Sequence, residues 1–148
     1  LGFDNVRTYL QSGNMVFESR EGAPAIAAAL GAAIADAHGF RPEVMVRTAA
    51  ELDAAIAGNP FPTEAKADPG HLLVLFTAGK VAAGARDRRA AVKVDQERLQ
   101  LGGRELYAYY GGGIGRSKVT VGVLEKALGT AVTGRNWNTV TKLAAMAA

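Results

Sequence analysis

The residues best suited to bind a ligand form a glycine-rich run that ends in positive charge. Glycines at positions 111, 112, 113 and 115 precede Arg116, Ser117 and Lys118, between a predicted strand and a predicted helix. The backbone N–H groups of such a loop, together with a helix N-terminus, favour an anion. We therefore predict a phosphate or nucleic-acid site at Gly113, Gly115, Arg116, Ser117 and Lys118. A flexible turn with solvated charges is the alternative interpretation.

The spacing of this run excludes nucleotide hydrolysis. A P-loop has two glycines separated by four residues and followed by Lys and then Ser or Thr. Here the spacing is one residue short, and Arg116 stands where the lysine should be. The run therefore predicts binding of phosphate groups without their transfer.

A second polar cluster precedes the predicted C-terminal helix and consists of Arg135, Asn136, Trp137 and Asn138. An aromatic ring, two amides and a guanidinium can stack on a base and hydrogen-bond to its edge. The alternative is structural: Asn136 or Asn138 caps the helix, Trp137 anchors it in the core and Arg135 binds a carbonyl. Both interpretations stay open at this stage.

The sequence predicts no catalytic residue, metal or cofactor. His38 and His71 are 33 positions apart with no carboxylate pattern around them, and we expect surface or capping roles for both. Ser12 and Ser117 do not lie in a nucleophile-elbow pattern. The absence of cysteine excludes a thiolate nucleophile, cysteine-ligated zinc and disulfides.

The elements that must position these residues begin with a predicted hairpin. Runs rich in β-branched and aromatic residues flank Ser12-Gly13-Asn14, whose glycine and asparagine tolerate the positive φ of a tight turn. Apolar residues spaced by four predict a helix over residues 24–38, which Gly39 ends. Residues 43–47 predict a strand, and residues 49–57 predict a short helix.

A linker-like stretch with two prolines and a glycine follows, and we divide the chain there into halves 1–60 and 61–148. The second half predicts strand 71–77, helix 79–92, strands 96–101 and 105–110, helix 116–128, strand 130–133 and helix 136–146. Up to the last helix, this is the split βαβ order of ferredoxin-like folds. The first half matches the last four elements of that order. We therefore expect an α+β fold of two ferredoxin-like halves in tandem, the first lacking its initial strand and helix.

Composition and charge are those of an ordinary globular protein with a basic tail. The chain has 148 residues, 49% hydrophobic and 21% charged, with a net charge of +3. From Gly111 onward the only acidic residue is Glu125, against five lysines and arginines, so this tail carries about +4. No apolar run reaches the roughly 18 residues of a membrane span, and the N-terminus does not resemble a signal peptide. We expect a cytoplasmic protein that is not inserted in a membrane.

Three separated segments carry a resemblance to a known family: VRTYLQSGNMVF at residues 6–17, GIGRSKVT at 113–120 and RNWNTV at 135–140. Together they resemble the bacterial family of domain of unknown function 1697 (DUF1697), and Asn59-Pro60-Phe61 is similar to that family's middle segment. The resemblance implies a two-part ferredoxin-like α+β fold and supplies no activity. Family members typically begin with a strand and a glycine-containing loop that have no counterpart here. We therefore expect an N-terminal truncation and a homodimer formed through the incomplete first half.

Three functional hypotheses follow. The first is a non-enzymatic module that binds nucleic acid or a phosphorylated small molecule through the two polar clusters. The second is an enzyme or small-ligand protein with a pocket between the halves, where Ser12, Asn14 and Asn59 meet the Arg135 segment. The third treats the same polar residues as a purely structural network.

Overall fold

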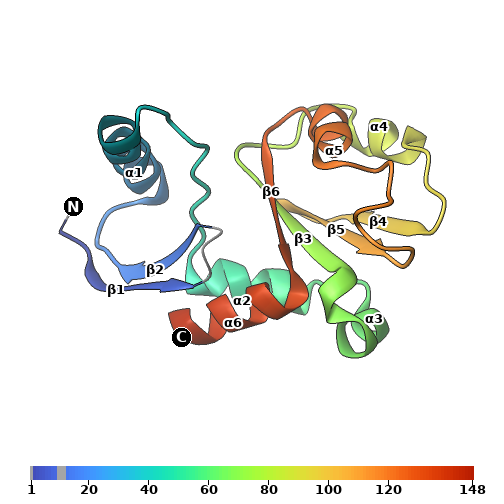
Figure 1. Cartoon of the computed structure of the whole chain (residues 1–148), viewed down its shortest axis with the longest axis horizontal. Helices are drawn as coiled ribbons and strands as arrows, with labels where there is room; N and C mark the ends of the chain where they lie inside the picture. Colours follow the sequence, from blue (N-terminus) through green and yellow to red (C-terminus); the bar gives the residue numbers. More distant parts are fainter. Residues whose placement is uncertain (1, 10–12) are drawn as a thin grey trace.

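The computed structural model describes residues 2–9 and 13–148 and shows a mixed α+β protein with two separate antiparallel sheets (Figure 1). One sheet has two strands near the N-terminus, and the other has four strands from the second half of the chain. The expected α+β class is confirmed.

The N-terminal hairpin and the helix that follows it form where the sequence predicts them. Strands β1 (Asp4–Tyr9) and β2 (Asn14–Glu18) pair antiparallel, and Gly13 before β2 has the positive φ of +88° that favours glycine. Helix α1 (Ala23–His38) ends at Gly39, which is left-handed and donates its N–H to the carbonyl of Ala35. Ser12 lies outside the described residues.

The strand predicted at residues 43–47 is wrong. This segment has the β-branched residues of a strand, but no described strand lies beside it, and a strand forms only against a hydrogen-bonding neighbour. Its last residue, Arg47, instead donates from its guanidinium to the carbonyl of Thr77 (2.7 Å) on the larger sheet. Helix α2 (Ala49–Ala57) then begins at a capping box made by Thr48 and Glu51.

The larger sheet has the strand order β4-β5-β3-β6, with every neighbouring pair antiparallel. Helix α3 (Pro62–Ala67) and the short 3₁₀ helix η1 (Pro69–His71) lead into it. Its elements in chain order are β3 (Leu72–Thr77), α4 (Ala85–Ala91), β4 (Glu97–Leu101), β5 (Glu105–Tyr110), α5 (Val121–Leu128), β6 (Val132–Asn136) and α6 (Trp137–Ala147). Helix α5 begins five residues later than predicted, because Thr120 caps it and the glycines before it form turns.

Helices cover both faces of the larger sheet. Figure 1 shows α4 and α5 on one side and α2 and α6 on the other. Side chains alternate along a strand, so Leu75 of β3 joins the core under α4 and α5, whereas Val74 and Phe76 join the core under α2 and α6. Helix α2, from the first half of the chain, contributes Leu52 and Ala55 to this second core.

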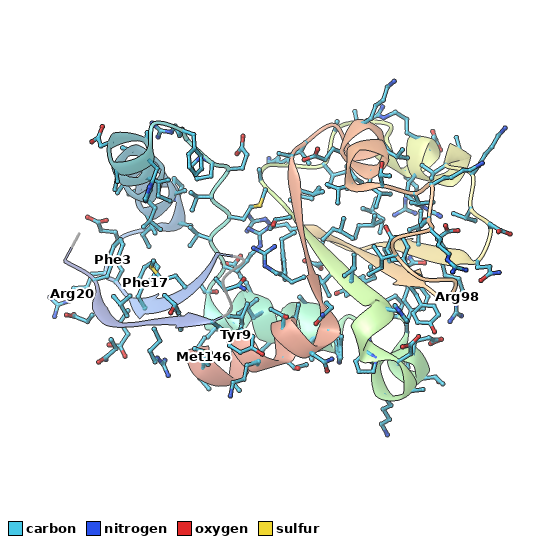
Figure 2. All side chains as sticks on the ribbon, in the orientation of Figure 1. Phe3, Tyr9, Phe17, Arg20, Arg98 and Met146 are labelled. Atoms are coloured by element: carbon cyan, nitrogen blue, oxygen red, sulfur yellow. The ribbon has the colours of Figure 1, made fainter. Side chains whose placement is uncertain are left out.

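The N-terminal hairpin and α1 contribute no residue to either of these two cores among the described residues. On the hairpin, Phe3 and Phe17 stack with ring centroids 4.2 Å apart (Figure 2). Val6, Met15 and Phe40 are exposed. The N-terminal region therefore buries much less apolar surface than the second half.

Candidate nucleic-acid interface

The glycine-rich run forms an ordered loop between β5 and α5. Gly113 has a φ of +94° and donates its N–H to the carbonyl of Tyr110 (2.9 Å), and Ser117 donates its N–H to the carbonyl of Ile114 (3.2 Å). The Tyr110 hydroxyl donates to the carbonyl of Val119 (2.8 Å). The loop therefore has a defined conformation in which the positive φ of Gly113 is required.

Ser117 fastens this loop to β4. Its hydroxyl donates to the carboxylate of Glu97 and accepts the N–H of Val119 at 3.0 Å. The hydrogen bond from Ser117 is the main reason that the pKa of Glu97 lies below its usual value. Ser117 thus positions the loop, and its hydroxyl is engaged within the protein.

The sequence predicted that Arg116 and Lys118 lie in the first turn of the helix. In the structure both residues precede α5, which begins at Val121. Thr120 caps α5 by accepting the N–H of Val123 (3.3 Å). Both basic side chains are exposed, and neither forms an ion pair with another described residue. They are available to an anionic ligand at the edge of the α5 N-terminus.

The second predicted cluster is used mainly by the fold. The Arg135 guanidinium donates to the side-chain oxygen of Asn14 (2.7 Å) and the hydroxyl of Thr133 (2.7 Å), and its half-burial lowers its pKa. Asn136 caps α6 by accepting the N–H of Thr139 (3.0 Å). Trp137 packs against the core under α2 and α6.

Asn138, the last residue of this cluster, has an exposed side chain. No hydrogen bond or ion pair between described residues joins Arg135–Asn138 to the glycine-rich loop. The ends of β5 and β6 lie at the same end of the larger sheet with β3 between them, so the two polar clusters begin at one sheet edge without bonding to each other.

Of the residues predicted to line a pocket between the halves, Asn14 hydrogen-bonds to Arg135, whereas Asn59 forms no hydrogen bond to residues 135–138 within the described part of the chain. Asn14 is buried, donates to the carbonyl of Tyr9 (3.0 Å) and accepts from Arg135, so it ties the hairpin to β6. The side chain of Asn59 accepts the N–H of Phe61 (3.0 Å). Ser12 lies outside the described residues. Two shallow depressions lie on the outer hairpin, around Val6 and around Arg20.

The sequence analysis missed a charged surface that the packing of α4 against α5 creates. We define the α4/α5 face as residues 78–95 and 111–130, which contain eight lysines and arginines against three acidic residues. Arg88 is used internally, because it donates to the carbonyls of Ala127 (2.8 Å) and Ala83 (3.0 Å). Six other basic side chains on this face are exposed and form no ion pair with a described residue: Lys80, Arg86, Lys93, Arg116, Lys118 and Lys126.

The α4 arginines were visible in the sequence as the run Arg86-Asp87-Arg88-Arg89, but they lie outside the basic tail. Only the pairing of α4 with α5 adds their charge to that of Arg116 and Lys118. The same face has a net charge of about +5 if all its groups are ionised, more than the whole chain.

Other chemistry is sparse in the described part of the chain. His71 lies 2.9 Å from the carboxylate of Asp68, which also accepts from the Tyr109 hydroxyl (2.8 Å). No group of three or more potential metal-ligating side chains occurs within residues 2–9 and 13–148. None of the helices described has the length and apolar character needed to cross a bilayer.

A family model described as "Protein of unknown function (DUF1697)" matches residues 1–107, which end before the glycine-rich loop. Among solved structures, the chain is similar to the conserved bacterial protein SP0830 from Streptococcus pneumoniae, with a TM-score of 0.75 and 18% identity. The similarity covers 99% of this chain and 82% of that chain. At this identity it shows the fold alone. The comparison with curated proteins found no match.

Proposed function

The chain belongs to the DUF1697 family, whose description names no activity. From the geometry we propose that it is a non-enzymatic module that binds nucleic acid through the α4/α5 face. The observation that supports the proposal is the set of six exposed, unpaired basic side chains on this face. A phosphate backbone that meets them releases its condensed counterions, and this release favours binding. No pocket or substrate pose is required.

Within this proposal the predicted residues have different roles. Arg116 and Lys118 contact phosphates directly, because both side chains are exposed beside the N-terminus of α5. Gly113 and Ser117 hold the loop in shape. Arg135 and Asn136 serve the fold through the bonds described above, so we leave them out of the interface.

Binding should be tested with a labelled oligonucleotide of about 20 nucleotides at about 50 and 200 mM NaCl. If about six cations contact phosphates, the affinity should fall between these two salt concentrations by roughly 300-fold for a single strand and by roughly a thousandfold or more for a duplex. The variant R86E/K126E reverses two charges on the α4/α5 face. Its matched control, K66E/K142E, makes the same change in net charge on α3 and α6, on the other side of the sheet.

We expect R86E/K126E to abolish binding at the lower salt concentration and K66E/K142E to retain most of it. No binding by the wild-type protein at low salt would refute the proposal. An equal loss in both variants would show that net charge alone, and not this face, attracts the ligand.

A pocket between the halves is the second candidate, and the Asn14 to Arg135 contact is the observation that favours it. A phosphorylated small molecule would be its ligand. The contact also serves as a tie between the hairpin and β6, since both side chains already use their hydrogen-bonding groups there. We therefore rank this candidate below the α4/α5 face.

We also propose the finer description of the fold and assembly. The antiparallel order β4-β5-β3-β6 supports a ferredoxin-like second half, preceded by a first half that contains the hairpin and α1. The division at residue 60 belongs to the same proposal, as do the cytoplasmic location and a homodimer. The exposed Val6, Met15 and Phe40 support dimerisation through the first half.

A further inference from the structure

Exposed aliphatic side chains gather on the same face as the basic ones. Seven large hydrophobic side chains of the described chain are exposed, and the three outside this face lie in the N-terminal region. The other four, which we call the aliphatic patch, are Val94 (50% exposed), Ile114 (42%), Val121 (43%) and Val123 (40%). Phosphate binding by itself gives these side chains no role.

The patch residues come from two neighbouring loops and the start of α5. Glu97 accepts from the Ser117 hydroxyl and from the N–H of Asp95 (2.8 Å), so it joins the segment of Val94 to the loop of Ile114. Gly112 of the same loop lies so close to Gln96 that a Cβ there would be 2.4 Å from the Gln96 amide oxygen. Val121 and Val123 lie in the first turn of α5, two positions apart, so their side chains diverge to either side of the exposed face of this helix.

Basic residues lie next to the patch residues in the chain. Lys93 precedes Val94 in the chain, and Arg116 and Lys118 follow Ile114. Lys126 lies three residues after Val123 on the same helix, and residues with that spacing are neighbours on a helix surface. A second copy of this chain is a poor occupant, because docking two such patches would bring like charges together.

We propose, on the premise of the function proposed above, that the α4/α5 face takes single-stranded nucleic acid in preference to duplex. Both forms offer phosphates to the basic side chains. A duplex turns its bases inward and would leave the aliphatic patch against charged backbone. An unpaired strand can turn its base faces toward the protein, and these supply the apolar surface that the patch needs.

The patch contains no aromatic ring and few groups that could read a base edge. Binding should therefore show little sequence preference, as is usual when base faces and not base edges are contacted. The chemical class of ligand that fits is an unpaired DNA or RNA strand of mixed sequence.

The test compares one strand of about 20 nucleotides with the same strand annealed to its complement, at about 50 mM NaCl. The variant I114S/V121T replaces two patch residues by polar ones without changing charge. The control V6T replaces a somewhat more exposed aliphatic residue on the hairpin. Thermal melts of all proteins check that the surface changes leave the fold intact.

We expect the wild type to bind the single strand more tightly than the duplex. I114S/V121T should weaken single-strand binding about threefold to tenfold, with an unchanged salt dependence. V6T should bind like the wild type.

Equal affinity for duplex and single strand, or no effect of I114S/V121T on single-strand binding, would overturn this inference and leave the proposed function standing. Failure of both probes to bind at low salt would overturn both. Loss of a dimer in I114S/V121T, measured by light scattering, would assign the patch to self-association and overturn the inference as well.

Discussion

One buried hydroxyl adds a hydrogen bond to the apolar packing of α2 on the larger sheet, and its removal should be costly. Tyr107 of β5 is 1% exposed, and its hydroxyl donates to the carbonyl of Ala55 at 2.5 Å. Ala55 lies in the last turn of α2, where carbonyls have no partner within the helix. No other donor to this carbonyl occurs among the described hydrogen bonds. Tyr107→Phe would therefore leave a buried acceptor unpaired.

An unpaired buried acceptor lowers the free energy of unfolding by about 1–3 kcal/mol. For a chain of this length, each kcal/mol lowers Tm by about 2–4 °C. Tyr109→Phe is the matched control, because it makes the same chemical change on the same strand. Its hydroxyl donates to the partly exposed Asp68, where water can replace it, so we expect a change within about 0.5 kcal/mol.

The same tyrosine should give an alkaline signature. Burial is the main reason that the pKa of Tyr107 is raised from 10.0 to about 12. The unfolded chain releases this proton near pH 10 while the folded protein keeps it, so stability is lost as the pH rises from about 10 to about 12. Tyr107→Phe should lose less stability over this interval than the wild type.

Urea unfolding followed by circular dichroism at neutral and alkaline pH measures both effects. The reasoning would be refuted if Tyr107→Phe were as stable as the wild type, or if Tyr109→Phe lost more free energy of unfolding than Tyr107→Phe. Either result would mean that this hydrogen bond does not hold α2 on the sheet.

Arg135→Ala should speed amide hydrogen exchange in the hairpin, because it removes the hydrogen bond to Asn14. It should also lower the free energy of unfolding by about 1–2 kcal/mol. Unchanged hydrogen exchange would contradict the proposed tie between the hairpin and β6. The pKa of Asp68 is lowered, chiefly by its hydrogen bond to His71. Its contribution to the stability of the fold is therefore present above the ordinary pKa of 3.8 and is lost as the pH falls through the lower pKa of the folded state. Acid unfolding of Asp68→Asn should accordingly depend less on pH than that of the wild type, and identical acid profiles would argue against the pair. Light scattering at micromolar concentration should show a dimer, whereas a monodisperse monomer with a cooperative melt would count against assembly through the first half.

Local patterns were sufficient for the elements whose determinants are neighbours in the chain. The hairpin around Gly102-Gly103, the helix that ends at Gly39 and the largely buried β3 lie where their residues predict. Turn glycines, apolar spacing and a continuous apolar run act over a few residues, so a sequence displays them directly. The cap of α6 by Asn136 belongs to the same class.

Elements that depend on a partner could not be predicted in this way. Residues 43–47 have strand-like side chains but no described strand beside them, and strand formation depends on a neighbouring ladder that no local pattern contains. Ser117 is likewise committed to Glu97, which lies 20 positions away in the sequence.

The sequence by itself determined the α+β class, the order of most elements and the presence of a basic glycine-rich loop. Only the tertiary structure decided which polar residues are exposed and which are used inside the fold. It directed Arg135 to Asn14 within the fold and joined the α4 charges to those of Arg116 and Lys118. The physical reason is that secondary structure follows from contacts between residues close in sequence, whereas burial and surface potential are sums over residues that meet only after the helices pack.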